Sequence, residues 1–286
     1  MRNIVAKAAA TLAEAGVASP SVDAGILAEQ AFGIDRLALS FADAPQEPAQ
    51  LRRFEQMVAR RAQREPLQHI LGYAPFYGLE FSVGPGVFIP RPETESLVEM
   101  AVQAARRAIA AGVAHPVIVD ACAGSGAVGV TLAHQVPEAR VVCIELHDEA
   151  LVFLERNASR LAPVEIVQAD ATDVGVLDAV LPQRECVDVF VSNPPYVPVG
   201  QATDVETATD PATAVFASDG GMAIIDPLVQ VAATWLKPGG FFAVEHDDST
   251  QSRVVEAVRS GGCFVDVRGC SDLAGRPRFV AASKIV

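Results

Sequence analysis

The sequence has few cysteines, and their spacing fits neither a disulfide framework nor a zinc site. Five occur among 286 residues, an odd number, and no two form a Cys-x-x-Cys pair. They stand at Cys122, Cys143, Cys186, Cys263 and Cys270. This pattern argues against a secreted disulfide-rich domain, and we expect reduced thiols, no bound metal ion and a cytoplasmic location.

Long apolar runs are also missing. No stretch approaches the ~20 consecutive apolar residues that a membrane helix needs. Arg2 and Lys7 precede an alanine-rich stretch, as in some signal peptides, but Glu14 interrupts it and leucine and isoleucine are sparse there. We expect an amphipathic helix at this end and a protein that does not associate with membranes.

Positive charge is scarce as well. Thirty-five acidic residues against 22 basic ones give a formal net charge of −13. Binding to a phosphate backbone requires clustered lysine and arginine, so we expect no direct contact with nucleic acid. One arginine cluster does occur, and we interpret it as a solvated helix face: Arg52, Arg53, Arg60, Arg61 and Arg64.

Half of the residues are hydrophobic, so the chain can bury a large core, and its length suits two domains. Residues 1–72 are predicted to be a small all-helical domain. Helical apolar spacing covers Ile4–Val17, Ser19-Pro20-Ser21 starts a second helix that runs to about Phe32, and a third spans about 49–64. A bundle of this size is suited to docking a substrate.

Residues 73–90 are predicted to form a β-hairpin that links two domains. Leu79–Val83 alternates between apolar and polar residues as a strand does. Gly84-Pro85-Gly86 then predicts a turn, and Val87–Ile89 the second strand.

Residues 91–286 are predicted to be an α/β domain, because buried strands alternate with helices from Val117 onward. This alternation indicates a doubly wound, mostly parallel, Rossmann-like sheet of seven strands. The predicted strands are Val117–Asp120, Val141–Glu145, Glu165–Gln168, Val187–Ser192, Phe241–Glu245, Phe264–Val267 and Arg278–Ala282. The predicted helices are Ala127–Gln135, Glu149–Leu161, Met222–Trp235 and Ser249–Ser260.

A candidate cofactor site follows the first three of these strands. Asp120-Ala121-Cys122-Ala123-Gly124-Ser125-Gly126 ends the first strand and opens a helix, where glycines allow a ligand to approach the backbone. Glu145 ends the second strand and could accept hydrogen bonds from two ribose hydroxyls. Asp170 follows the third strand, where an adenine ring would lie. Ligands of such sheets bind at this edge.

This segment alone leaves the cofactor open. Residues 124–129 also satisfy the G-x-G-x-x-G pattern of nicotinamide and flavin nucleotide sites, with Glu145 downstream. S-adenosylmethionine and a dinucleotide are about equally compatible with it. A purely structural turn with close helix packing is the third interpretation.

Asn193-Pro194-Pro195-Tyr196, the Asn-Pro-Pro-Tyr segment, ends the fourth strand beside this crevice. An amide or exocyclic amino nitrogen is a poor nucleophile, because its lone pair is delocalised. The Asn193 side-chain oxygen and the Pro194 carbonyl can accept hydrogen bonds from its two N–H groups, and the Tyr196 ring can stack on the planar group. Hydride transfer has no use for this arrangement, so the segment favours methyl transfer from S-adenosylmethionine.

The chain resembles the HemK-type glutamine methyltransferases of peptide-chain release factors along nearly its whole length. The resemblance rests on Glu65-Pro66-Leu67-Gln68-His69-Ile70-Leu71-Gly72, Phe76-Tyr77-Gly78-Leu79, Ile89-Pro90-Arg91-Pro92-Glu93-Thr94-Glu95, Leu236-Lys237-Pro238-Gly239-Gly240 and Asp272-Leu273-Ala274-Gly275-Arg276, besides the Asn-Pro-Pro-Tyr segment. Where the family usually has Gly-Thr before Gly-Ser-Gly, this chain has Cys122-Ala123.

The resemblance implies that S-adenosylmethionine donates a methyl group to the side-chain nitrogen of the glutamine in a Gly-Gly-Gln loop, leaving S-adenosylhomocysteine. It implies that the helical domain engages the release factor. The expected cofactor residues are Asp120, Cys122, Ala123, Gly124, Ser125, Gly126, Glu145, Asp170, Ala171 and Asn193. The expected substrate residues are Asn193, Pro194, Pro195 and Tyr196, of which Asn193, Pro194 and Tyr196 are expected to be catalytic.

Two alternatives to this function remain. One keeps the chemistry and changes the substrate, and the other keeps only the fold. The same reaction could act on a ribosomal-protein glutamine or on adenine N6 of DNA, although the acidic composition argues against DNA. A binding module that has lost turnover is the other, and the intact Asn-Pro-Pro-Tyr segment argues against it.

Overall fold

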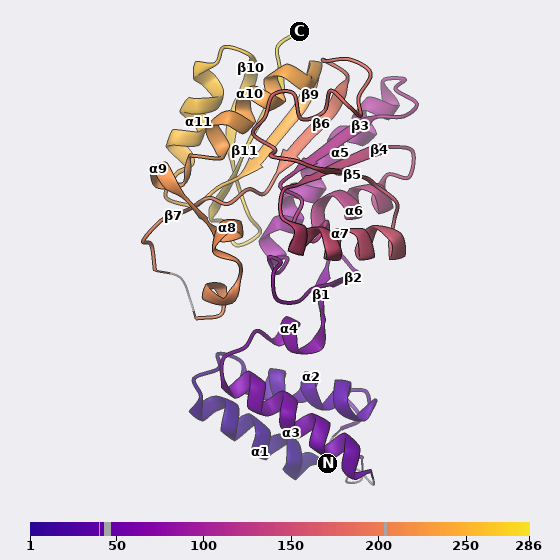
Figure 1. The fold of residues 1–286 in the computed structure, drawn as a ribbon, viewed down its shortest axis with the longest axis vertical. Coiled ribbons are helices and arrows are strands. Elements are labelled where there is room, and N and C mark those ends of the chain that lie inside the picture. Colours follow the sequence, from indigo (N-terminus) through magenta and orange to yellow (C-terminus); the bar gives the residue numbers. More distant parts are fainter. Residues whose placement is uncertain (40, 43–46, 203–204) are drawn as a thin grey trace. The chain divides into compact units, whose positions relative to one another are not determined.

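The computed structural model describes residues 1–39, 41–42, 47–202 and 205–286, and it divides into two compact units. One unit contains Met1–Tyr73 together with residues 205–209. The other contains Ala74–Ala202 and Asp210–Val286. Figure 1 follows the chain through both units by colour.

The helical unit is built from α1 (Arg2–Glu14), α2 (Pro20–Phe32), α3 (Pro48–Ala62) and the short α4 (Leu67–Leu71). Proline at the first position starts α2 and α3, where its missing N–H costs no hydrogen bond. The three long helices enclose an apolar core that includes Leu12, Leu27 and Phe54. The turn η2 (Thr207–Thr209) joins this unit from far along the chain, which no sequence pattern predicted.

Interpreting the arginine cluster as a solvated face is wrong for Arg61. This side chain is 3% exposed. Its guanidinium donates to Asp23 Oδ2 at 2.7 Å and to Glu206 Oε1 at 2.6 Å, both within the helical unit. The reason is helical periodicity, because Arg61 shares the buried face of α3 with Phe54, Met57 and Val58. Arg52 and Arg53 are exposed, as expected.

The β-hairpin lies earlier than predicted. Its strands are β1 (Tyr73–Phe76) and β2 (Leu79–Ser82), and Tyr77-Gly78 form the turn. Tyr77 and Gly78 have φ values of +50° and +75°, the two positive values that a type I′ hairpin turn requires. The prediction of Val87–Ile89 as the second strand is wrong. Val87 and Ile89 instead pack in a small apolar cluster with Val83 and Ala150.

The second unit confirms the predicted α/β fold with a mostly parallel sheet of seven strands in the order β10-β11-β9-β6-β3-β4-β5. Each pair of neighbouring strands in the part β9-β6-β3-β4-β5 is parallel, whereas β11 is antiparallel to both of its neighbours, β9 and β10. The strands are β3 (Val117–Ala121), β4 (Arg140–Glu145), β5 (Glu165–Gln168), β6 (Val187–Ser192), β9 (Leu236–Glu245), β10 (Phe264–Ser271) and β11 (Pro277–Lys284).

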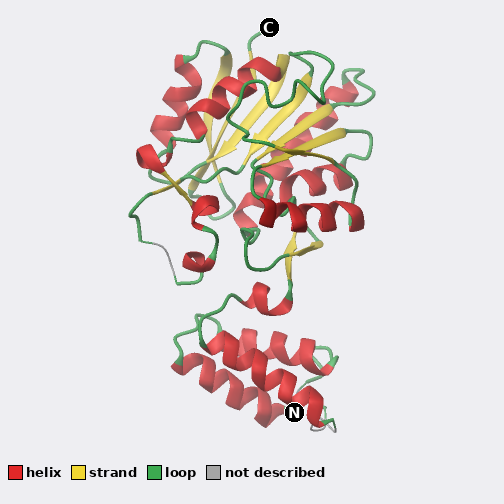
Figure 2. Cartoon of the chain, viewed as in Figure 1, coloured by secondary structure: helices red, strands yellow, loops and turns green. Residues whose placement is uncertain are grey.

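Helices cover both faces of this sheet (Figure 2). The α5, α6 and α7 helices pack on one face, and α10 and α11 on the other. Their bounds are Glu95–Ala110 (α5), Ala127–Gln135 (α6), Asp148–Arg160 (α7), Ile225–Trp235 (α10) and Gln251–Ser260 (α11). The alternation of strands and helices did not predict α5, because this helix precedes the first strand of the sheet.

Short elements complete the unit. They are η1 (Pro92–Thr94), β7 (Val197–Pro198), α8 (Ala212–Val215), β8 (Phe216–Ala217) and α9 (Ser218–Gly221). Within the described ranges, the structure contains no helix long and apolar enough to cross a membrane.

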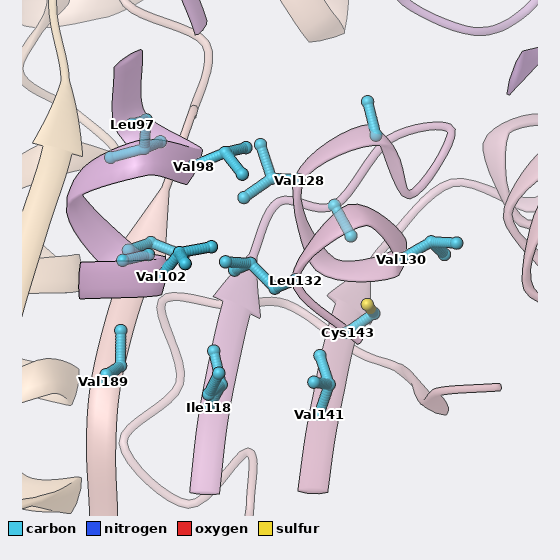
Figure 3. Packing of buried hydrophobic residues seen from close by; sticks show 14 of the residues in the cluster. Leu97, Val98, Val102, Ile118, Val128, Val130, Leu132, Val141, Cys143 and Val189 are labelled. Atoms are coloured by element: carbon cyan, nitrogen blue, oxygen red, sulfur yellow. The ribbon is translucent and has the colours of Figure 1, made fainter. Parts of the chain in front are cut away.

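Continuous apolar packing fixes the strand ends in space. Figure 3 shows Leu97, Val98 and Val102 of α5 beside Val128 and Leu132 of α6, above strand residues Ile118, Val141 and Val189. All six residues of β6 are buried, as expected for a central strand covered on both faces. The loops that follow the strands therefore start from a rigid edge.

Candidate active site

The carboxyl ends of the central strands meet at one edge of the sheet. Ala121 of β3 is paired with Ile144 of β4 and with Ser192 of β6, and Glu145 is paired with Gln168 of β5. The Ser192 hydroxyl also donates to the Ala121 carbonyl at 2.7 Å. The glycine-rich loop, Glu145, Asp170 and the Asn-Pro-Pro-Tyr segment therefore all begin along this one edge.

The glycine-rich loop turns through left-handed backbone conformations. Cys122, Gly124 and Gly126 have φ values of +62°, +57° and +82°. A residue with a Cβ pays roughly 1–2 kcal/mol there, so Cys122 occupies a conformation that suits the glycine of the family pattern. Burial raises the pKa of the Cys122 thiol above its usual range, and the side chain therefore stays protonated. The Ala123 N–H donates to the Ile144 carbonyl at 2.9 Å, which holds the loop against β4.

Close packing beneath the loop depends on two glycines. A Cβ at Gly126 would lie 2.5 Å from Leu154 Cδ1, and one at Gly129 would overlap Cys143 Sγ. The Gly129 N–H donates to Asp120 Oδ2 at 2.7 Å. Asp120 is 1% exposed, and burial raises its pKa to about 7. The carboxyl group predicted to contact the cofactor thus lies under the loop, where it fixes the first turns of α6.

Glu145 is held in one orientation at the end of β4. Its Oε2 accepts from the Gly124 N–H at 2.7 Å, and its Oε1 accepts from the Leu146 and His147 N–H groups at 2.9 Å. A Cβ at Gly124 would meet no atom within 4 Å, so the space above the loop is open. An open glycine loop beside a fixed carboxylate fits the ribose and amino-acid parts of S-adenosylmethionine.

Asp170 and Ala171 follow β5 beside Glu145, because the Ala169 N–H donates to the Glu145 carbonyl at 3.1 Å. Asp170 is exposed, and its Oδ1 accepts from the Thr172 N–H at 2.9 Å and from the Thr172 hydroxyl at 2.7 Å. Ala171 is buried in the core beneath. These contacts hold the loop after β5 in place, next to the carboxylate expected to bind ribose.

The Asn-Pro-Pro-Tyr segment is anchored at both ends. Asn193 Nδ2 donates to Thr94 Oγ1 at 3.2 Å, and the Tyr196 hydroxyl donates to Glu245 Oε1 at 2.8 Å. Pro194 is buried, whereas Pro195 and the other two residues are partly exposed. Burial and the nearby Glu245 raise the pKa of the Tyr196 phenol well above its usual range, so it remains a neutral donor.

Two supporting residues escaped prediction from sequence. Asn157 of α7 is 0% exposed, accepts from the Ser82 N–H at 2.7 Å and donates to the Ser125 carbonyl at 2.9 Å. It therefore ties the hairpin to the glycine-rich loop. Gly221 has a φ of +89°, and a Cβ there would overlap the Tyr196 carbonyl oxygen. The sequence did contain signals for both residues. For Asn157 the signal was an asparagine among the buried positions of an amphipathic helix, and for Gly221 it was the pair Gly220-Gly221.

We expect Glu145→Ala to weaken S-adenosylmethionine binding by about tenfold to several hundredfold, because hydrogen bonds to charged groups contribute roughly 1.5–3 kcal/mol each. Titration calorimetry measures the affinity directly. Glu155→Ala, which removes an exposed carboxylate from α7, is the control and should leave affinity unchanged. Equal affinities for the two variants would show that Glu145 has no part in the cofactor site.

Comparisons with known proteins match both units. A PrmC N-terminal domain family model matches residues 3–72, and a methyltransferase small domain model matches residues 106–251. A release factor glutamine methyltransferase of Mycolicibacterium smegmatis is 49% identical over 100% of this chain and 98% of its own length. One of Mycobacterium tuberculosis is 44% identical over 99% of this chain and 91% of its own.

A more distant relative and a solved structure extend the comparison. A 4-amino-L-phenylalanine/4-methylamino-L-phenylalanine methyltransferase of Streptomyces pristinaespiralis is 39% identical over 73% of this chain and 70% of its own. The hMettl16 catalytic domain, solved in complex with MAT2A 3′UTR hairpin 1, aligns with a TM-score of 0.56 over 80% of each chain. At 13% identity it shows a shared fold alone.

Proposed function

Because this chain belongs to the release factor glutamine methyltransferases, we propose that it methylates the side-chain nitrogen (N5) of the glutamine in the Gly-Gly-Gln loop of peptide chain release factors. S-adenosylmethionine supplies the methyl group at the glycine-rich loop and leaves as S-adenosylhomocysteine. The observation that carries the proposal is the Asn-Pro-Pro-Tyr segment, which starts directly after Ser192, beside the loop that follows Ala121.

The residues of this segment act by orientation. Asn193 Oδ1 and the Pro194 carbonyl accept hydrogen bonds from the two N–H groups of the glutamine amide, and the Tyr196 ring supports its planar face. Holding both N–H bonds directs the nitrogen lone pair at the methyl carbon and favours the pyramidal nitrogen that forms during attack. The chain contributes geometry in this reaction. The bond between the amide nitrogen and the methyl carbon would form as the bond between that carbon and the cofactor sulfur breaks, and the methylated nitrogen would then lose one of its two protons to water.

The cofactor residues act by binding separate parts of S-adenosylmethionine. We propose that Gly124–Gly126 let the backbone approach the methionine part and that Glu145 accepts hydrogen bonds from the ribose hydroxyls. Asp170 and Ala171 border the adenine. Asp120 and Gly129 contribute indirectly, by fixing the first turns of α6 under the loop.

A second candidate substrate is a small aromatic amine, since one relative is named for that activity. The two substrates are separated by incubating the protein with labelled S-adenosylmethionine and either an intact release factor or 4-amino-L-phenylalanine. Mass spectrometry then locates the added methyl group. Label on the release-factor glutamine supports the proposal, whereas label only on the amine contradicts it.

We further propose that the helical unit docks the release factor, because a lone glutamine side chain offers too little surface for selectivity. Remote contacts must then supply both discrimination and orientation. The exposed Arg52 and Arg53 of α3 are the candidate contacts. Reversing both to glutamate should lower kcat/KM for an intact release factor roughly tenfold, since exposed ion pairs contribute about 0.2–1 kcal/mol each and reversal adds repulsion.

Two controls isolate docking from the chemical step. A short Gly-Gly-Gln peptide should be a poor substrate for the unmodified protein, because it lacks the remote contacts, and activity on it should not change in the Arg52→Glu, Arg53→Glu variant. Reversing Arg106 and Arg107, an exposed adjacent pair on α5, should leave activity on the intact factor unchanged. Equal losses in the two double variants would indicate a general charge effect and contradict docking through α3.

A further inference from the structure

A chain of four hydrogen-bonded side chains lies behind the Asn-Pro-Pro-Tyr segment. Asn193 Nδ2 donates to Thr94 Oγ1 at 3.2 Å, and the Thr94 hydroxyl donates to Glu245 Oε2 at 2.8 Å. From the other side, the Tyr196 hydroxyl donates to Glu245 Oε1 at 2.8 Å. The two oxygens of Glu245 thus receive both ends of the chain.

The direction of each hydrogen bond follows from the ionised state of Glu245. A carboxylate can only accept, so Thr94 must point its single hydroxyl hydrogen at Glu245. The Thr94 oxygen then offers only lone pairs to Asn193. The Asn193 amide must therefore turn its NH₂ group toward Thr94 and its oxygen away from it.

We propose, on the basis of the proposed function, that Thr94 and Glu245 are positioning residues that keep the Asn193 oxygen facing the glutamine amide. The two ends of an asparagine amide have nearly the same shape, so packing alone selects between them weakly. A reversed Asn193 would present N–H donors to the N–H bonds of the substrate, and the hydrogen bond would be lost. Neither residue needs to contact substrate or cofactor for this role.

Burial makes the charge on Glu245 sensitive to pH near neutrality. The carboxyl group is 0% exposed, and this burial raises its pKa to about 7. The hydrogen bonds from Thr94 and Tyr196 and the charge of Arg278 on β11 favour the ionised form, whereas Glu93 of η1 opposes it. Below this pH a protonated Glu245 can donate to Thr94. The Thr94 hydrogen is then free to turn toward Asn193 and reverse its amide.

The test compares Thr94→Val, Thr94→Ser and Glu245→Gln with the full-length protein and an intact release factor. Thr94→Val should lower kcat about tenfold to a hundredfold, as a misplaced reacting group does, with the affinity for S-adenosylmethionine unchanged. Thr94→Ser keeps the hydroxyl and should restore kcat to within about threefold, well inside the loss expected for misplacement.

The pH profile gives the second readout. In the unmodified protein kcat should fall as pH decreases through about 7, because Glu245 becomes protonated. Glu245→Gln removes the titrating group and should flatten this limb. Glu99→Gln is the matched control, since Glu99 accepts from the Tyr77 hydroxyl at 2.7 Å on the exposed face of α5. It should keep the unmodified profile.

The outcomes of these experiments either support or overturn the positioning role of Thr94 and Glu245. Normal kcat in Thr94→Val, equal losses in Thr94→Val and Thr94→Ser, or an unchanged pH limb in Glu245→Gln would overturn the positioning role. If the unmodified protein does not methylate the release factor, the proposed function fails instead, and the two failures remain distinguishable. Should Thr94→Val unfold, the pH profile of Glu245→Gln still decides.

Discussion

Asn193→Ala is expected to lower kcat for release-factor methylation by ~10²–10³, the usual loss when a group that stabilises the transition state is removed. The variant lacks the oxygen that accepts a hydrogen bond from a substrate N–H group, while the backbone of β6 and its pairing with β3 remain. Single-turnover methylation with saturating cofactor measures the effect on the chemical step.

Glu145→Ala supplies the reciprocal control for this prediction. Asn193→Ala should lose turnover and keep most of its affinity for S-adenosylmethionine, whereas Glu145→Ala should lose affinity and recover rate when the cofactor is raised. Near-normal turnover by Asn193→Ala would contradict the mechanism, because no other side chain was assigned to accept that hydrogen.

Gly221→Ala should reduce kcat by about a hundredfold, the loss that a displacement of roughly 1 Å at a reacting group can cause. Gly221 has a φ of +89°, and a Cβ there would lie well within 3.0 Å of the Tyr196 carbonyl oxygen. Backbone must shift to relieve this overlap, and the shift displaces the end of the Asn-Pro-Pro-Tyr segment. The rate constant at saturating substrate is the relevant measurement.

Gly200→Ala separates this overlap from backbone strain alone. Gly200 has a similar φ of +90°, but a Cβ there would meet no atom within 4 Å. Both variants carry the cost of a left-handed alanine, of order 1–2 kcal/mol. Only Gly221→Ala should lose most of its activity, and similar losses in both would mean that strain, and not the contact with Tyr196, is responsible.

Local patterns were sufficient to place the sheet and the loops at its edge. The predicted Glu165–Gln168 and Val187–Ser192 strands agree with β5 and β6 at both ends. Continuous apolar runs mark strands that are buried on both faces, and glycines directly after a strand mark the turn into a helix. The hairpin was misplaced, because Gly84-Pro85-Gly86 is a stronger turn pattern than Tyr77-Gly78.

The cofactor motif shows why a short pattern stays ambiguous. Gly124 leaves open space for a ligand, whereas Gly129 is required because α6 packs tightly on Cys143. Both satisfy the same spacing in the sequence. Asp120 was assigned to the cofactor from its place in the motif, yet its carboxyl group lies beneath the loop, hydrogen-bonded to the Gly129 N–H. The direction of a side chain at a strand end depends on the hydrogen-bonding groups and the space that the neighbouring helix offers it.

By itself the sequence determined the α/β fold, the seven strands of the large sheet in their order along the chain and the candidate chemistry of the Asn-Pro-Pro-Tyr segment, because strand periodicity, glycine turns and this segment are all local features. Only the tertiary structure decided that Thr94 and Glu245 lie behind Asn193 and that Arg61 is buried between Asp23 and Glu206. Thr94 and Glu245 are 151 positions apart. A hydrogen bond between such distant residues leaves no periodic trace in the chain, since it exists only after the sheet and its helices have packed.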